Sequence, residues 1–249
     1  MPSSKKLKVV VVMPAYNAEK TLVRTYEDLP KHVVDEIILV DDGSHDKTVA
    51  IAKKLGLKTL VHPQNRGYGA NQKTCYTLAL NEDAQIVVMI HPDYQYDSTL
   101  TDEIIRPIQD HRFDIMLGSR IRTRQEALAG GMPLYKYIAN RFLTAVENTI
   151  LGQNHSEYHT GFRAYHRRVL TKLPFHKFSD DFVFDQELLI SAVRAGFRIG
   201  EIPVPTRYFP EASQINFIRS TKYGLQTLFT LLKYIAVSIG IYKSKIFSA

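Results

Sequence analysis

The sequence has a single cysteine, Cys75, among its 249 residues. One cysteine excludes an internal disulfide and a zinc site built from cysteines, and it fits a reducing compartment better than secretion. The basic N-terminus is followed by a short apolar run at residues 9–13, which is too short for a signal-peptide core. We therefore expect a protein that is not secreted and in which this run forms the first strand.

No stretch of the chain matches the ~20 consecutive apolar residues that a membrane-spanning helix needs. Residues 223–242 come closest, but Lys233 and several polar and glycine residues interrupt them. Basic residues flank this stretch: Arg219, Lys222, Lys243 and Lys245. Two interpretations stay open, namely an amphipathic helix that closes the domain or forms a dimer face, and a helix that lies at a membrane interface.

Acidic residues are outnumbered, with 25 Asp and Glu against 32 Lys and Arg and a formal net charge of +7. A positive balance favours anionic partners such as nucleic acids, phosphorylated small molecules and acidic membranes. The chain has no dense basic tract, no recognisable DNA-reading helix and no platform of aromatic residues for stacking bases. We therefore expect a phosphorylated ligand or a membrane surface as partner, and no nucleic acid.

The composition is that of a globular protein, 45% hydrophobic and 23% charged, and short apolar runs alternate with amphipathic stretches. The apolar runs are typical of buried strands, and the stretches between them have helical spacing. The predicted strands are 9–13, 36–40, 59–62 and 86–90, and the predicted helices are 20–29, 47–55 and 68–80. This pattern predicts an α/β fold with an open, doubly wound parallel sheet that binds its ligand at the carboxyl ends of the strands.

The alternation changes beyond residue 113, where a basic, glycine-containing loop at 121–132 precedes a helical segment at 134–151. No clean linker separates this part from the first, which favours one domain with a specialised second half. We expect that domain at residues 1–218 and a basic, apolar helical tail at residues 219–249.

Polar or glycine-rich turns follow the four predicted strands. They are Pro14-Ala15-Tyr16-Asn17, Asp41-Asp42-Gly43-Ser44, Asn65-Arg66-Gly67-Tyr68-Gly69 and His91-Pro92-Asp93-Tyr94-Gln95. Helix capping alone explains any one of them. Four together, with carboxylates after two neighbouring strands, favour a ligand crevice.

The turn around Asp93 is a candidate cation site. His91, Asp93 and Gln95 share one face if the backbone stays extended, and Pro92 favours extension. Carboxylate and amide oxygens are ligands for divalent cations, and a histidine nitrogen suits Mn²⁺ better than Mg²⁺. A cation here would bridge two phosphates and neutralise the charge that develops on a departing nucleoside diphosphate. The alternative for His91 is a purely structural hydrogen bond.

The turn after residue 40 is a candidate nucleoside site. Asp41 or Asp42 could accept a hydrogen bond from a base or a ribose hydroxyl, and Gly43 allows close backbone approach. Part of this turn is expected to cap the following helix instead. The turn with Arg66 and Gly67 adds a cation that either contacts the donor or only leads into a helix.

Seven segments together resemble the family 2 glycosyltransferases, and they occur in the order of that family along nearly the whole chain. The segments are Pro14 to Asn17, Val40 to Thr48, Asn65 to Gly67, the Asp93 turn, Gly118-Ser119-Arg120, Thr160 to Tyr165 and Phe184 to Leu188. The branch that they resemble most is the dolichol-phosphate mannosyltransferase and polyprenyl-phosphate glycosyltransferase group.

The resemblance implies a GT-A fold, a nucleotide-sugar donor, Mn²⁺ or Mg²⁺, and inversion at the anomeric carbon. It implies three sets of site residues. The donor-binding set is Pro14, Ala15, Tyr16, Asn17, Glu19, Asp41, Asp42, Arg66 and Gly67. The metal set is Asp93 and Gln95, to which the candidate cation site described above adds His91. The phosphate set is Arg120, Arg141 and Arg163, and the catalytic set is Asp93, Asp185 and Arg120.

The sequence departs from the family pattern at three places. His91 stands where the pattern has the first carboxylate of Asp-x-Asp, and Ala18, with Glu19 beside it, replaces a glutamate. Ser213-Gln214 replaces a Ser-Lys pair, so that Arg207 or Arg219 would have to supply the cation.

We expect a metal-dependent inverting glycosyltransferase that acts on a polyprenyl phosphate at the cytoplasmic membrane face, with peripheral contact through residues 219–249. A phosphate acceptor is already ionised and needs no protein base. One alternative is a saccharide or glycolipid acceptor, for which Asp181, Asp185 or Glu187 would be the base. The other alternative is a non-catalytic nucleotide-sugar binding protein.

Overall fold

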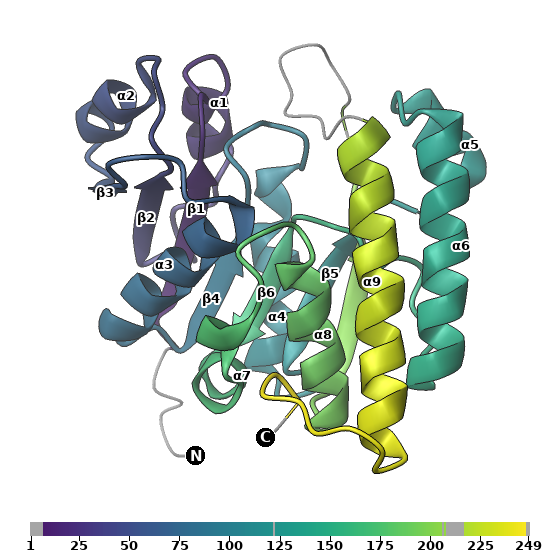
Figure 1. Ribbon diagram of the computed structural model, residues 1–249. Coiled ribbons are helices and arrows are strands. Elements are labelled where there is room, and N and C mark those ends of the chain that lie inside the picture. The colour runs from purple at the N-terminus through teal and green to yellow at the C-terminus, as the bar shows by residue number, and fades with distance from the viewer. Residues whose placement is uncertain (1–6, 122, 206, 208–216, 248–249) are drawn as a thin grey trace.

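A seven-stranded sheet forms the centre of the protein in a computed structural model that describes residues 7–121, 123–205, 207 and 217–247 (Figure 1). The strand order is β3-β2-β1-β4-β6-β5-β7. Only β6 among these strands runs antiparallel to its neighbours, so the predicted, mostly parallel α/β sheet is confirmed. The strands are β1 (Val9–Ala15), β2 (Glu36–Asp41), β3 (Lys58–Val61), β4 (Ile86–Met89), β5 (Ile115–Ser119), β6 (Arg163–His166) and β7 (Ile199–Pro203).

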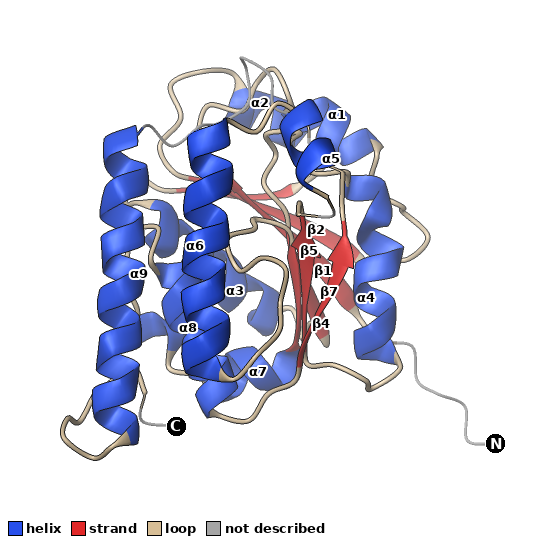
Figure 2. Ribbon diagram, turned by 90° about the vertical axis from the view of Figure 1, so that its right-hand side faces the viewer, coloured by secondary structure: helices blue, strands red, loops and turns tan. Residues whose placement is uncertain are grey.

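Helices cover both faces of the sheet, as Figure 2 shows with the sheet nearly edge-on. Side chains of β1 alternate between two buried clusters: Val10 and Val12 face the cluster of α3 and α8, whereas Val9 and Val11 face that of α1, α2 and α4. The helices are α1 (Leu22–Glu27), α2 (Thr48–Lys54), α3 (Tyr68–Asn81), α4 (Thr101–Gln109), α5 (Arg124–Ala129), α6 (Leu134–Leu151), α7 (Arg167–Lys172), α8 (Phe184–Arg194) and α9 (Phe217–Ser238), with short turns η1 (Ser98–Leu100) and η2 (Phe175–Lys177).

Local signals place several elements where they were predicted. The helix predicted at 134–151 is α6, which begins after Pro133 and ends before Gly152, whose φ of 64° lies in the left-handed region that favours glycine. The strand β7, the helix α4 and the reversed direction of β6 were not predicted, because strand order and direction depend on contacts between distant segments.

The C-terminal segment packs along the domain. Helix α9 lies beside α6 and α8, and both views show α6 and α9 next to each other on one side of the protein. After α9 the chain returns to α8, where the carbonyl of Phe247 accepts a hydrogen bond from Arg194 Nε at 3.1 Å and the Phe247 side chain is buried. No helix within the described ranges has the length and apolar character needed to cross a membrane.

Candidate active site

The turns after β1 and β2 are tied together at the carboxyl edge of the sheet. Asn17 adopts a left-handed backbone with φ of 51°, a conformation that asparagine tolerates. Its N–H donates to Ser44 Oγ at 2.8 Å, and its Oδ1 accepts from the His45 N–H at 2.9 Å. Pro14 and Ala15 are buried in this edge, whereas the Tyr16 ring is 50% exposed beside it. The two turns thus form one rigid rim with an available aromatic face.

Asp41 is buried at the end of β2, and only one of its carboxylate oxygens is used. Oδ2 accepts from the N–H groups of Gly43 and Ser44 at 3.1 and 2.9 Å. Oδ1 is buried and has no hydrogen-bond partner in the described structure. An unpartnered buried oxygen is costly unless a ligand donates to it. This geometry suits the predicted contact with a base N–H or a ribose hydroxyl.

Asp42 has a different place from the one predicted. Its Oδ1 lies 2.8 Å from His62 Nδ1 and accepts from the Arg66 N–H, and its Oδ2 accepts from the Gly67 N–H at 3.0 Å. Both oxygens of Asp42 are thus engaged within the protein, whereas Asp41 keeps one oxygen without a partner in the described structure. Asp42 therefore anchors the turn that carries Arg66, and its predicted contact with the nucleoside is corrected to this anchoring role. His62, which pattern analysis missed, is the buried partner that makes this anchor.

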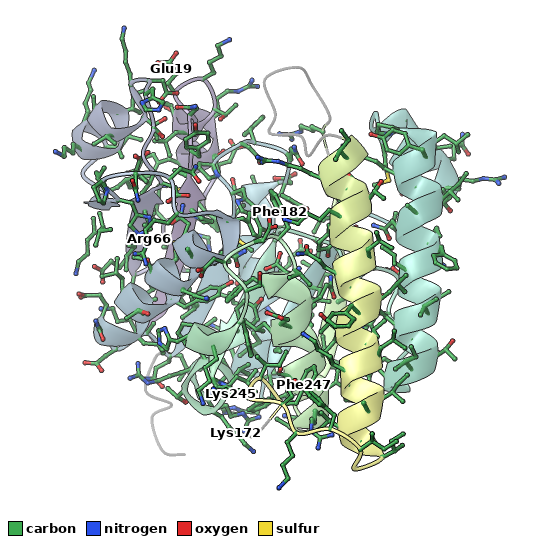
Figure 3. The ribbon with its side chains drawn as sticks, viewed as in Figure 1. Glu19, Arg66, Lys172, Phe182, Lys245 and Phe247 are labelled. Atoms are coloured by element: carbon green, nitrogen blue, oxygen red, sulfur yellow. The ribbon has the colours of Figure 1, made fainter. Side chains whose placement is uncertain are left out.

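The Arg66 turn leads into α3 under a loop from the second half of the chain. Gly67 has φ of 102°, and a Cβ there would lie 2.7 Å from the Asp180 carbonyl oxygen. That carbonyl accepts from the N–H of Gly69 at 2.8 Å, at the start of α3. The Arg66 side chain is exposed. In Figure 3, Arg66 and Phe182 lie in the upper half of the view, and Phe247 lies near the bottom.

The predicted cation site after β4 has a bent backbone. Tyr94 has φ of 60°, which breaks the extended run between Asp93 and Gln95, so the prediction that His91, Asp93 and Gln95 share one face was wrong. Asp93 Oδ1 instead accepts from the Gln95 N–H at 3.1 Å. Burial raises the pKa of Asp93, although the charge of His91 and the Gln95 N–H act in the opposite direction. Nearby positive groups therefore do not offset the cost of burying this carboxylate.

A buried polar network lies beside this turn. Tyr68 Oη is 3.2 Å from His91 Nε2 and donates to Asp185 Oδ2 at 2.8 Å. Asp185, at the start of α8, also accepts from Gln72 Nε2 at 3.0 Å and lies 3.0 Å from Arg163 Nη1. The network joins the end of β4, the start of α3, β6 and α8, which are distant in sequence.

The three predicted phosphate-binding arginines occupy different environments. Arg163 is fully buried, pairs with Asp185 and donates from Nε to the Thr160 carbonyl at 2.7 Å, so it cannot reach a phosphate. Its predicted phosphate contact is corrected to a structural role. Arg141 is exposed on α6 and donates to the Ser156 carbonyl at 2.7 Å, which leaves it accessible.

Arg120 follows β5 and is held by a buried carboxylate. Its backbone N–H donates to Glu157 Oε2 at 2.7 Å, and its Nε donates to Glu157 Oε1 at 2.9 Å. Asn140 of α6 donates to the same Oε1 at 2.7 Å, and Glu157 is 0% exposed. The Arg120 side chain is 12% exposed, so its position is fixed before any ligand arrives. Pattern analysis missed Glu157 and Asn140, because neither follows a predicted strand.

The remaining predicted carboxylates already have partners. Asp181 Oδ2 pairs with Lys222 of α9 at 2.6 Å, and Glu187 Oε2 accepts from the Ser179 N–H at 2.5 Å. Burial raises the pKa of Glu187, opposed by that N–H and more weakly by lysine charges. Glu19, labelled in Figure 3, accepts from the Lys47 N–H at 3.0 Å and so joins two loops.

Of the two arginines expected to replace the missing cation, Arg207 lies near the Asp93 turn. Its N–H donates to the Gln95 carbonyl at 3.0 Å, and its guanidinium lies 4.8 Å from the centre of the Tyr94 ring. Arg219 is exposed in the first turn of α9. Ser213 and Gln214 lie outside the described residues.

The sequence is similar to those of known proteins. The profile named Glycosyl transferase family 2 matches residues 10–173. The chain belongs to glycosyl transferase family 2. A UDP-N-acetylglucosamine–dolichyl-phosphate N-acetylglucosaminyltransferase of Methanococcus voltae is 29% identical over 80% of this chain and 86% of that protein. A dolichyl-phosphate hexose transferase of Haloferax volcanii is 28% identical over 80% of this chain and 82% of that protein.

The fold is similar to that of solved structures. Glucosyl-3-phosphoglycerate synthase of Mycobacterium tuberculosis, solved with Mn²⁺, UDP and phosphoglyceric acid, superposes with a TM-score of 0.71, covering 96% of this chain and 80% of that one. At 22% identity this likeness shows the GT-A fold alone. The family 2 chain is therefore a glycosyltransferase with a GT-A fold, as the sequence predicted.

Proposed function

We propose that this family 2 enzyme transfers a sugar from a nucleoside-diphosphate sugar to a polyprenyl phosphate, with inversion at the anomeric carbon. The observation that carries the donor half is the buried, unpartnered Asp41 Oδ1 beside the exposed Tyr16 ring, which suits a nucleoside. Two relatives are named as dolichyl-phosphate transferases, which supports the acceptor class.

We propose further that Mn²⁺ or Mg²⁺ takes part. Asp93 fits a cation, because burial raises its pKa and its Oδ2 has no hydrogen-bond partner among the described residues. No group of three or more His, Cys, Asp or Glu in the described part of the chain is arranged to hold a metal, so Asp93 and His91 would be assisted by phosphate oxygens and water. A bound cation would neutralise charge on the departing diphosphate.

The acceptor proposal rests on how the candidate bases are engaged. Asp185 is paired with the buried Arg163 and accepts hydrogen bonds from Tyr68 and Gln72, so its oxygens are already engaged. Asp181 is paired with Lys222, and burial is outweighed by hydrogen bonds and the lysine charge, so that its pKa is lowered. A sugar hydroxyl needs a base, whereas an ionised phosphate does not. Arg120 and Arg141 are the cations that would bind the acceptor phosphate.

The surface of α6 and α9 supports contact with a membrane that holds such an acceptor. Both helices expose large apolar side chains: Leu134, Ile138 and Phe142 on α6, and Ile218, Leu225, Phe229 and Leu232 on α9, with Ile239 directly after α9. Helix α9 has no acidic residue, and the only one in α6, Glu147, is buried. An apolar face with basic and no exposed acidic residues suits an anionic lipid surface. We therefore place the enzyme peripherally at the cytoplasmic membrane face.

Donor and acceptor are tested separately. Calorimetry with UDP and GDP, each with Mn²⁺, should show binding of one nucleotide, and transfer from its sugar conjugates should follow with a short-chain polyprenyl phosphate in detergent. Transfer to a saccharide but not to the lipid phosphate would favour the alternative acceptor. Nucleotide binding without transfer or donor hydrolysis would favour a non-catalytic binding protein.

Vesicle sedimentation tests the membrane contact. Phe142→Ser/Ile138→Ser and Phe229→Ser/Leu232→Ser should each reduce binding to phosphatidylglycerol vesicles by about tenfold, because each pair removes exposed apolar contacts. Val61→Ser is the matched control, since Val61 is 45% exposed on the edge strand β3. Equal binding of all variants would contradict the proposed face, and a shift from dimer to monomer would assign it to a second copy.

A further inference from the structure

Tyr68 lies at the centre of the network beside the proposed cation site. It is the first residue of α3, and its ring stacks on the His91 imidazole with 5.4 Å between ring centres and 29° between planes. The Phe182 ring covers it at 4.6 Å. Its hydroxyl contacts His91 Nε2 at 3.2 Å and Asp185 Oδ2 at 2.8 Å. The residue thus touches both the turn after β4 and the start of α8.

The protons in this network can be counted. Asp185 lies 3.0 Å from the buried Arg163 guanidinium and accepts a hydrogen bond from Gln72, so its oxygens serve as acceptors in this network. The Tyr68 hydroxyl donates to Asp185 Oδ2 at 2.8 Å. A phenol has one proton, and here it goes to Asp185. The Tyr68 oxygen must therefore accept from His91, which places a proton on Nε2.

This proton determines what the other imidazole nitrogen can do. In a neutral imidazole with a proton on Nε2, Nδ1 carries a free lone pair and can ligate a metal ion. The hydrogen bond made by one nitrogen commonly selects the ligating nitrogen in this way. No hydrogen bond of His91 Nδ1 occurs within the described structure.

Gly161 gives the imidazole its space. A Cβ at this position would lie 2.7 Å from His91 Cδ2, closer than carbon atoms approach without a shift. The Gly161 N–H donates to Tyr96 Oη at 2.7 Å, which holds the backbone in place. The imidazole is thus held from two segments, by the ring and hydroxyl of Tyr68 and by the close backbone at Gly161.

We infer that Tyr68 is a positioning residue that holds His91 as the Nε2–H tautomer, with Nδ1 directed to the divalent cation beside Asp93. The inference rests on the proposed metal dependence. It gives His91 a ligand role that compensates for the carboxylate missing from the Asp-x-Asp pattern. It also links the ligand to Asp185, so that α3 and α8 together set the geometry of the turn after β4.

The tautomer is measured in metal-free protein by ¹⁵N NMR of labelled histidine, with the His91 signal assigned by its loss in His91→Ala. The wild type should show a protonated Nε2, and Tyr68→Phe should shift His91 away from this single tautomer. Tyr76→Phe is the matched control, because it also removes a buried hydroxyl, one that donates to Gln72 Oε1 at 2.6 Å without touching His91. An Nδ1–H tautomer in the wild type, or no change in Tyr68→Phe, would overturn the inference.

Manganese affinity gives the second readout, from the EPR signal of free Mn²⁺ titrated with protein. Loss of a group that orients a metal ligand typically costs about 10–100-fold in affinity, so Tyr68→Phe should weaken Mn²⁺ binding by at least about tenfold and Tyr76→Phe should not. Added to His91→Ala, Tyr68→Phe should have no further effect. An equal loss in both backgrounds would show that Tyr68 acts independently of His91. If the wild type transfers sugar without metal, the proposed metal dependence fails, whereas the tautomer result stands on its own.

Discussion

The two halves of the site hold their polar groups in opposite ways. On the proposed donor side, the ends of β2 and β4 carry Asp41 and Asp93, each with one carboxylate oxygen bound to nearby N–H groups and the other without a partner among the described residues. On the acceptor side, Arg163 and Arg120 are paired with the carboxylates Asp185 and Glu157. The first half offers unpartnered oxygens to a ligand. In the second half, on the proposed acceptor side, Arg163 is neutralised within the protein, whereas Arg120 and Arg141 keep some exposure for a phosphate.

This difference separates groups that bind from groups that hold the fold. A buried carboxylate with a free oxygen gains from a ligand, whereas a buried ion pair loses its compensation when one partner is removed. Substitutions on the donor side should therefore reduce activity or affinity and leave stability unchanged. Substitutions of buried charges on the acceptor side should reduce stability first.

The largest effect is expected at Asp93. Asp93→Ala should lower the transfer rate by about 1,000-fold, because a Lewis-acid cation is worth several kcal/mol and each ~1.4 kcal/mol is tenfold. Stability should not fall, since burial raises the pKa of Asp93 and so disfavours its charge in the folded protein. Steady-state kinetics measures the transfer rate, and thermal unfolding measures the stability. Asp110→Ala, an exposed position, is the control, and full activity of Asp93→Ala would remove Asp93 from the site.

Arg163 tests the other side of the comparison. Arg163→Met should lower the free energy of unfolding by about 3–5 kcal/mol, because it leaves Asp185 as a buried, uncompensated charge. The double variant Arg163→Met/Asp185→Asn should recover part of this loss in urea denaturation. Arg141→Met, at an exposed arginine, should change stability by less than about 0.5 kcal/mol. If Arg163→Met were stable but unable to bind phosphate, the original prediction for Arg163 would be restored.

Asp41 is expected to show an intermediate effect on affinity. Asp41→Asn should weaken nucleotide binding by about 10–100-fold, because a hydrogen bond to a charged group contributes ~1.5–3 kcal/mol. Calorimetry with the preferred nucleotide measures the loss. Asp83→Asn is the matched control, since its side chain is 91% exposed. Unchanged affinity in Asp41→Asn would mean that its free oxygen faces no ligand.

The smallest effect is a pH dependence of stability at Asp114. Burial raises the pKa of Asp114, but the Arg198 N–H and the charges of Arg168 and Arg198 outweigh burial, so the pKa is lowered in the folded protein. A lowered pKa means that, below about pH 4, the unfolded chain binds more protons than the folded protein. Stability therefore decreases as the pH falls through this range. The ion pairs of Asp114 with the exposed side chains of Arg168 and Arg198 contribute up to about 1 kcal/mol each.

Asp114→Asn checks this contribution. The variant should be less stable than the wild type at pH 7, and the difference should shrink as the pH falls below about 4. Thermal unfolding at both pH values measures it. A difference that stays constant with pH would show that the carboxylate charge contributes nothing, and that only its hydrogen bonds matter.

The neighbouring residues Asp41 and Asp42 show how far sequence patterns predict a site. Their position after a buried strand predicted a polar turn at the ligand edge, and the turn is there. Which carboxylate keeps an unpartnered oxygen was not predictable, because Asp42 is bound by His62 and by the Arg66 turn, which are 20 and 24 residues away. The arginines show the same limit. Arg141 and Arg163 have the same side chain, but only the folded structure shows that Arg141 is exposed and Arg163 is buried.

The sequence by itself determined the family, the α/β class, the predicted strands of the first half and the bounds of α6, because strand periodicity and helix caps are local. The tertiary structure alone decided the reversed direction of β6, the anchoring role of Asp42, the burial of Arg163 and the place of Tyr68 between His91 and Asp185. Each of these depends on segments that meet only after folding. Burial then decides whether a charged group is available to a ligand or is needed by a partner.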